Sequence, residues 1–189
     1  YSDGRRIYGK HEMLKQDGSI TKLSISPSGR TLNPEARDAL LEADIIIMGP
    51  GSFYASVLPG LLIGNAAELI ERSKAMKIFI SNIMTQPGQT EGYTVSEHIK
   101  EFAKYTGHRK IIDYCVVNSR KIDEEAFKRY ALQGADPVEN DLEKLSSMGV
   151  KVVQKDIVSR DQESAQHDTK ALAKALVDLI IEHRAGRRA

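Results

Sequence analysis

The chain has 189 residues, of which 41% are hydrophobic and 28% are charged, and this apolar content is sufficient for one α/β domain with its own core. Its 27 basic and 26 acidic side chains nearly balance, so the charge predicts no nucleic-acid partner. No apolar run approaches the roughly 18 residues of a membrane span, and the single cysteine, Cys115, lies in an apolar stretch. We therefore expect a cytoplasmic protein without a membrane span.

Two Asp-Gly turn signals lie near the start of the chain. The pair Asp17-Gly18 has flanking segments long enough for both arms of a hairpin, so the sequence predicts an N-terminal β-hairpin region there. The pair Asp3-Gly4 has only two residues before it, and the chain does not start with Met. We therefore expect a further N-terminal segment with at least one strand, without which apolar strand residues such as Ile45, Ile47 and Val116 are incompletely covered.

Helices and strands are predicted to alternate after residue 32. Asn33 followed by Pro34 is typical of a helix start, Thr94 to Glu97 form a capping box, and Asp168 is expected to cap the last helix. Val and Ile runs indicate strands at 44–48, 77–82, 111–118 and 150–157, and helices are expected at 33–44, 65–74, 94–107, 123–132, 141–149 and from 168 onward. This alternation predicts an α/β fold with a mostly parallel sheet and helices on both faces.

Two loops follow the expected carboxyl ends of neighbouring strands, where open parallel sheets bind ligands. The first brings backbone N–H groups close to an anion, because glycine has no Cβ; it consists of Gly49, Pro50, Gly51 and Ser52. The second offers neutral polar groups suited to sugar hydroxyls or a base edge, namely Asn82, Thr85 and Gln86. Taken alone, a glycine motif this short is equally typical of a plain tight turn.

Groups for acid/base chemistry or for metal binding are missing from both loops. Neither contains a histidine, a cysteine cluster or a pair of carboxylates, so no metal site is predicted. His98 and His108 have no partners at the spacing of metal ligands, and we expect both at the surface.

Five stretches of the chain carry a resemblance to a known family. They are "ADIIIMGPGSFYASVLPGLL", "ISNIMTQPGQTEGYTVSEH", "VVNSRKI", "RYALQGADPV" and "QHDTKALAKAL". With these, the sequence resembles the gluconeogenesis factor family, UDP-N-acetylglucosamine-binding proteins within the 2-phospho-L-lactate transferase-like superfamily. The resemblance covers nearly the whole chain but only the C-terminal portion of such a protein, because the family's N-terminal glycine loop of the type Gly-Gly-Gly-Thr-Gly is absent.

The resemblance implies a three-layer Rossmann-like fold, with residues 1–189 as the C-terminal portion of a single domain. It implies that the nucleotide sugar is bound by Gly49, Pro50, Gly51, Ser52, Tyr54, Asn82, Thr85, Gln86, Tyr130 and Gln166. Two departures stand out. Gln166 occupies a position where many members have Arg, which removes a cation for a diphosphate, and the second loop has Gln89 and Glu91 where Pro-Gly-Glu-Thr-Asp is usual.

Three functions agree with the sequence. The first is a regulator of central carbon metabolism and cell-envelope synthesis that binds UDP-N-acetylglucosamine without turning it over. The second is a transferase resembling 2-phospho-L-lactate transferase, which would use Mg²⁺. The third is a folding or oligomerisation module whose binding chemistry lies in the absent half. Expected partners are a nucleotide sugar and either that N-terminal half or a partner chain, a second copy included.

Overall fold

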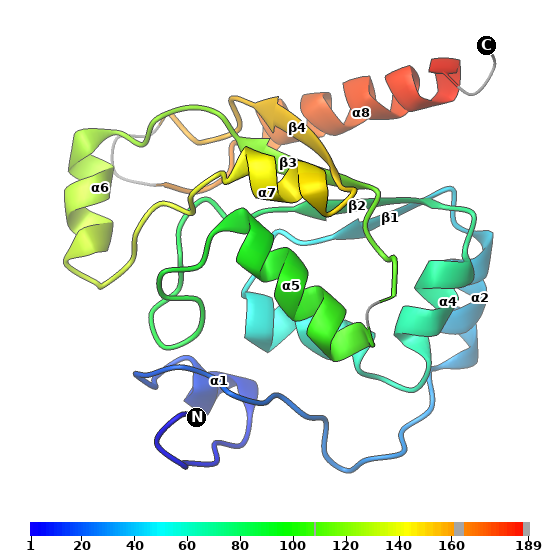
Figure 1. Ribbon diagram of the computed structural model, residues 1–189, viewed down its shortest axis with the longest axis horizontal. Coiled ribbons are helices and arrows are strands. Elements are labelled where there is room, and N and C mark those ends of the chain that lie inside the picture. The colour runs from blue at the N-terminus through cyan, green and yellow to red at the C-terminus, as the bar shows by residue number, and fades with distance from the viewer. Residues whose placement is uncertain (108, 161–164, 187–189) are drawn as a thin grey trace.

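A four-stranded parallel sheet forms the centre of the molecule (Figure 1). The computed structural model describes residues 1–107, 109–160 and 165–186. The strands are β1 (Ile45–Met48), β2 (Met76–Ile80), β3 (Tyr114–Asn118) and β4 (Lys151–Lys155), and they lie side by side in that order. The predicted parallel sheet is thus confirmed, and the loops that follow β1 and β2 leave adjacent strands at the same edge.

Helices cover both faces of the sheet, as predicted. On one face lie α3 (Leu58–Leu61), α5 (Val95–Thr106) and α7 (Leu142–Ser147), with the π-helix η1 (Phe53–Val57) before α3. On the other face lies α8 (Thr169–Gly186) (Figure 1). The pair α2 (Pro34–Glu42) and α4 (Ala66–Arg72) pack together beside the sheet, while α6 (Glu124–Ala131) lies beyond the carboxyl ends of the strands.

Strand alternation divides the core into two layers. Side chains of successive strand residues point to opposite faces, so Phe79 packs against α5 while its neighbours Ile78 and Ile80 pack against α8. Every residue of β2 is buried, because helices cover it from both sides and strands flank it. Continuous apolar runs rather than alternating ones are therefore what this strand requires.

The predicted helix caps are present. The side chain of Asn33 accepts a hydrogen bond from the Glu35 N–H at 2.8 Å. In the capping box, Thr94 Oγ1 accepts from the Glu97 N–H at 3.4 Å, and a Glu97 carboxylate oxygen accepts from the Thr94 N–H at 2.8 Å. Asp168 Oδ1 accepts from two N–H groups at the start of α8. These bonds satisfy amide groups that have no partner within the helix.

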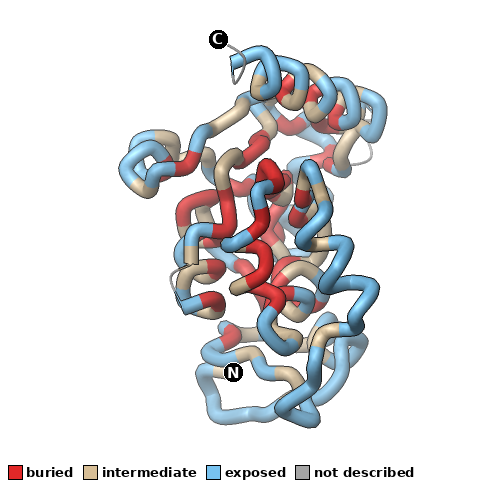
Figure 2. Tube along the Cα trace, turned by 90° about the vertical axis from the view of Figure 1, so that its right-hand side faces the viewer, coloured by how far each residue is buried: buried red, intermediate tan, exposed pale blue. Residues whose placement is uncertain are grey.

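The predicted N-terminal β-hairpin is wrong. Residues 1–44 contain no strand, and α1 (Lys10–Met13) occupies the expected first arm. Gly18 does adopt a positive φ of 95°, but side-chain bonds hold the turn, since Arg5 donates to Gln16 Oε1 at 2.7 Å and to the Asp17 carbonyl at 2.8 Å. A hairpin needs a cross-strand ladder with a buried face, whereas this segment is mostly exposed (Figure 2).

His98 is buried, which corrects the expectation that it lies at the surface; His108 lies outside the described residues. His98 is on the inner stripe of α5, its ring 4.9 Å from that of Phe53 and 5.3 Å from that of Tyr93. Its Nδ1 lies 2.8 Å from the Thr94 carbonyl, so Nδ1 carries the hydrogen because a carbonyl oxygen only accepts. Nε2 has no hydrogen-bond partner among the described residues.

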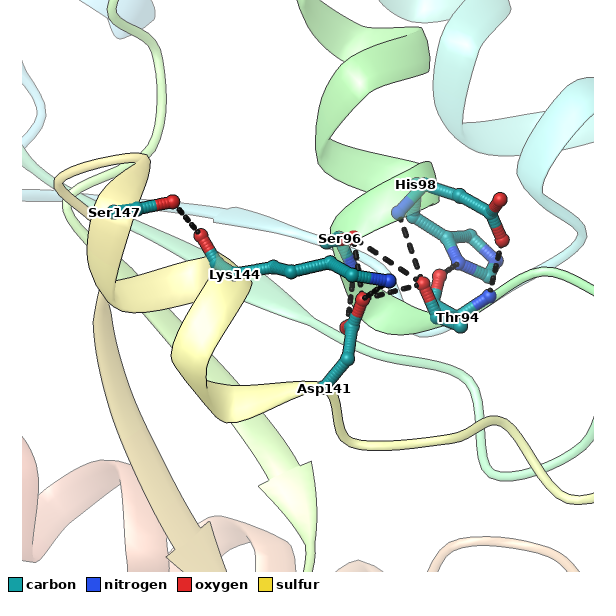
Figure 3. Close-up of polar contacts among 7 residues, drawn as sticks. Thr94, Ser96, His98, Asp141, Lys144 and Ser147 are labelled. Atoms are coloured by element: carbon teal, nitrogen blue, oxygen red, sulfur yellow. Dashed lines mark hydrogen bonds and ion pairs between the residues drawn. The ribbon is translucent and has the colours of Figure 1, made fainter.

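The carboxylate of Asp141, whose side chain is only 7% exposed, joins the starts of α5 and α7 (Figure 3). Asp141 accepts hydrogen bonds from the Ser96 N–H at 2.9 Å, from the Ser96 hydroxyl and from the Thr94 hydroxyl at 2.8 Å. Burial acts to raise the pKa of Asp141, but these donors outweigh it and hold the pKa below its usual value. Lys144 completes the cluster, its Nζ 3.5 Å from Asp141. The negative charge also faces the positive end of the α5 dipole.

β1 forms one edge of the sheet. Ile47 is 47% exposed and Ile45 is half-buried, as expected for strand residues that lack full cover. Val116, for which the same was expected, is completely buried because its strand is central and α8 covers it. In the described part of the chain no single helix has the length and apolar character of a membrane span, although the bent pair Phe53–Leu61 and Ala66–Arg72 passes such a test jointly.

The loop before α5 contains two glycines with similar backbone conformation, Gly88 and Gly92, but only Gly88 lies so close to another segment that a side chain would clash. Gly88 and Gly92 have φ values of 70° and 69°, but a Cβ on Gly88 would lie 1.7 Å from the Gln16 carbonyl oxygen, whereas one on Gly92 would meet nothing within 4 Å. Both Gly→Ala variants pay about 1 kcal/mol for the left-handed conformation. We expect Gly88→Ala to destabilise the protein by at least about 1 kcal/mol more than Gly92→Ala in urea unfolding. Equal losses would show that the Gln16 segment does not pack there.

Buried His98 should make stability depend on pH. Burial lowers its pKa, so the ring stays neutral in the folded state, while after unfolding it titrates near its ordinary value of about 6.5. The contribution of neutral His98 to the free energy of unfolding is therefore complete above pH 6.5. It is lost as the pH falls below that value, by up to about 1.4 kcal/mol per pH unit.

His98→Phe should flatten the fall in unfolding free energy between pH 7 and 5, measured by urea denaturation. Some slope should remain, because burial also lowers the pKa of His167. His11→Gln, at an exposed position, is the matched control and should leave the slope unchanged. A slope that His98→Phe does not alter would contradict the assignment.

Candidate functional site

The two loops identified in the sequence meet at the carboxyl edge of the sheet. Gly49 follows β1 with φ 85°, and a Cβ there would lie 2.9 Å from the Ile80 carbonyl oxygen at the end of β2. A larger residue would force the first loop away from the second strand. Glycine at this position therefore lets the two loops lie side by side.

Gln86 bridges these loops through its side-chain amide. Its Nε2 donates to Ser52 Oγ at 3.0 Å, and its Oε1 accepts from the Phe53 N–H at 3.2 Å. The amide thus satisfies the start of η1, where a backbone N–H would otherwise lack a partner. Gln86 fixes the relative position of the two loops.

A cavity of about 670 Å³ opens at this edge, beyond the ends of β2 and β3. Most of its wall consists of amide, cationic and apolar side chains. The amides are Asn82, Asn118 and Asn140, the cations are Arg120, Lys121 and Lys128, and apolar contacts come from Ile122, Phe127 and Val138.

Hydrogen bonds hold the loop that follows β3. Asn118, the last residue of the strand, donates to the Arg120 carbonyl at 2.6 Å and accepts from the Ile157 N–H at 3.3 Å. Asn140 Nδ2 in turn donates to the Asn118 carbonyl at 2.7 Å. This network anchors the segment that carries Arg120 and Lys121 against the sheet.

The cavity carries a positive charge. Arg120 lies 3.9 Å from Asp156, a distant pair, while in the described part of the chain no carboxylate pairs with the ammonium groups of Lys121 and Lys128. Glu124 is the acidic residue of the wall. Several cations, amides and an apolar wall are together suited to an organic anion with hydrogen-bonding groups.

Comparisons with known proteins identify the family of the chain. The family model described as 2-phospho-L-lactate transferase CofD matches residues 1–158. The chain belongs to this family. It is 38% identical over 180 residues to the gluconeogenesis factor of Bacillus subtilis (strain 168), covering 95% of this chain and 56% of that protein. It is 32% identical to the gluconeogenesis factor of Halalkalibacterium halodurans, covering 93% of this chain and 54% of that protein.

The fold of the family is confirmed by a crystal structure of a Bacillus halodurans protein. The two superpose with a TM-score of 0.86 at 32% identity, and the match covers 93% of this chain and 56% of that one. The chain thus spans about half the length of the relatives it matches.

Family resemblance predicted several residues that the structure brings together. Asn82 lines the cavity itself. The first loop and Gln86 lie beside each other through the Ser52 bond, although neither is part of the cavity wall. Pro50 is exposed, and Gly51 has room around its Cα.

Two residues of that prediction are buried inside the protein. Tyr54 is fully buried, and its hydroxyl lies 2.8 Å from the Tyr93 hydroxyl and 2.8 Å from a Glu101 carboxylate oxygen. Burial raises the pKa of Tyr54. Thr85 is also buried, and its hydroxyl accepts from the Asp136 N–H at 2.9 Å. Both hydroxyl groups form hydrogen bonds inside the protein, and neither residue lines the cavity.

Tyr130 and Ala165, the residue before Gln166, belong to the same apolar cluster although they are far apart in sequence. Tyr130 packs on the apolar cluster that contains Ile83 and Ala165, and the exposed Gln166 follows Ala165 directly. His167 holds this segment to the sheet, its Nε2 3.2 Å from the Ser81 carbonyl. Both predicted residues thus lie near the loop that begins at Asn82, outside the cavity wall.

Sequence reasoning missed the cations of the cavity. The rule that ligands gather beyond the carboxyl ends of parallel strands was applied to the first two strands and not to the third. Applied to β3, it would have identified Asn118, Arg120 and Lys121. Lys128 gives no such signal, because its place depends on how α6 packs beyond the sheet.

Proposed function

We propose that the protein binds a nucleotide sugar such as UDP-N-acetylglucosamine in the cavity beyond β2 and β3, and that it acts as a regulator of carbon metabolism rather than as a catalyst. The observation that carries the proposal is the composition of the cavity wall. A diphosphate needs cations, which Arg120, Lys121 and Lys128 offer. A sugar and a base need amide donors and acceptors as well as an apolar surface.

The apolar part of the wall suits a planar base. Phe127 is 41% exposed and lines the cavity, so its ring is accessible to a ligand there. Stacking on such a ring is worth about 1–3 kcal/mol for a nucleobase. The volume of about 670 Å³ lies in the usual range of sites for organic ligands.

The regulatory part of the proposal is supported by the names of the relatives, which are called gluconeogenesis factors. Among the described residues, no group of three His, Cys, Asp or Glu side chains could hold a metal ion. We therefore assign no residues to Mg²⁺ and derive no transfer step.

The alternative is a transferase, favoured by the description of the family model that matches residues 1–158. The two proposals differ in the fate of the ligand. A regulator leaves UDP-N-acetylglucosamine intact, whereas a transferase that uses it moves the sugar or sugar-phosphate group to an acceptor, water included, and releases the remaining uridine nucleotide. Incubation with protein and Mg²⁺, followed by chromatography of the nucleotides, separates them.

Two variants of the wall test the binding site. Phe127→Ala removes the exposed ring, and Lys128→Gln removes one cation, so each should weaken UDP-N-acetylglucosamine binding by about 1–3 kcal/mol in isothermal titration. Lys100→Gln is the matched control, because Lys100 is exposed on α5 and away from the cavity. If Lys128→Gln and Lys100→Gln behave alike, the cavity is not the site of the phosphates.

Gln166→Arg tests the nearby segment. A guanidinium forms charge-assisted bonds to a diphosphate that a neutral amide lacks, and Gln166 is exposed beside the loop of Asn82. We expect tighter binding of UDP-N-acetylglucosamine, with a gain that shrinks as NaCl is raised from 50 to about 500 mM because salt screens an exposed charge. An unchanged affinity at low salt would place the diphosphate elsewhere.

A further inference from the structure

A second cavity lies at the opposite, amino-terminal edge of the sheet. It has a volume of about 380 Å³ and is lined where β2, β3 and β4 begin, with the end of α8 beside it. Its lining includes Lys74, Lys77, Lys110 and Lys151. None of its residues belongs to the candidate functional site.

Lys77 gives this cavity its unusual character. The residue is only 7% exposed, yet its ammonium group makes one hydrogen bond, to the Ser73 carbonyl at 2.9 Å. An ammonium has three N–H donors, so two remain for a further acceptor. Burying a charge without a paired counter-ion is costly, and a side chain kept in this state points to an anion that enters from the cavity.

The other lysines add to the same field. In the described part of the chain the ammonium groups of Lys74, Lys110 and Lys151 have no carboxylate partner, and that of Lys151 lies 5.4 Å from the centre of the Tyr114 ring. The Tyr114 hydroxyl is 3.0 Å from His183 Nδ1, which places a phenol and an imidazole in the wall.

The acidic groups nearby are already engaged. Asp113, the carboxylate of the lining, accepts the Lys77 backbone N–H at 3.0 Å. Glu71 lies close to Lys77, but it pairs with Arg109 at 2.7 Å and accepts the Lys110 N–H at 3.3 Å. Four ammonium groups thus face one carboxylate within the wall.

We propose that this cavity is a second ligand site, which binds a small polyanion of the phosphate or pyrophosphate class. An anion of that kind supplies the acceptors that Lys77 lacks and draws the flexible, exposed lysines around it. The site is independent of the nucleotide-sugar site, because the two cavities share no residue and lie at opposite ends of the strands.

The test is a titration of the protein with inorganic pyrophosphate at low salt, by calorimetry and by ¹H–¹⁵N correlation spectra. We expect saturable binding that shifts the amide signals of Lys77, Tyr114 and Gly149. Lys110→Gln/Lys151→Gln should weaken it at least tenfold, whereas Lys22→Gln/Lys100→Gln, an equal change of charge at exposed positions, should change it less than twofold. Lys77→Met should abolish the saturable binding of pyrophosphate. The ¹H–¹⁵N spectrum of this variant verifies that it is folded.

A third pair of substitutions distinguishes this site from the first cavity. Lys121→Gln/Lys128→Gln removes two cations from that cavity and should leave pyrophosphate binding at the amino-terminal edge intact. The proposal would be overturned if Lys110→Gln/Lys151→Gln and Lys22→Gln/Lys100→Gln weakened pyrophosphate binding equally. It would also be overturned if the amide signals shifted only in the residues after β3. The absence of saturable binding would overturn it as well.

Discussion

Burial of β2 from both sides is the constraint on which the rest of the structure depends. Its five residues are all shielded, with Phe79 against α5 and Ile78 and Ile80 against α8. A strand fixed in this way has no freedom to shift its register, because a slip by one residue would exchange the two faces. The close approach of Gly49 to the Ile80 carbonyl requires that fixed position. Both cavities are lined by residues at or next to the ends of this strand. Asn82 follows its carboxyl end, and Lys77 is its second residue.

Local signals in the sequence predicted the frame of the molecule and part of its site. The caps at Asn33, Thr94 and Asp168 act within a few residues, and the apolar runs report strands buried on both faces. The same information was insufficient where a residue's place depends on distant contacts. The burial of Tyr54 rests on Tyr93 and Glu101, which are 39 and 47 positions away in the chain.

Charge shows the same limit of sequence information. A net charge of +1 correctly describes the whole chain, but it hides that cations gather at both edges of the sheet. The parallel arrangement produces this pattern, since every strand begins at one edge and ends at the other. Lysines adjacent to strand starts therefore converge, as do polar residues adjacent to strand ends. Composition can exclude a strongly charged surface overall, yet it carries no information on such local convergence.

The distance between the two cavities decides how they can influence each other. A five-residue strand spans about 17 Å, which is roughly twice the Debye length of about 8 Å at physiological ionic strength. Salt thus screens most of the interaction between solvent-exposed charges at the two edges, so direct electrostatic coupling between anions in these open cavities is weak. Coupling through the protein would require β2 or β3 to move along its axis. The packing of both strands between α5 and α8 opposes that movement, so the two cavities should fill independently of each other.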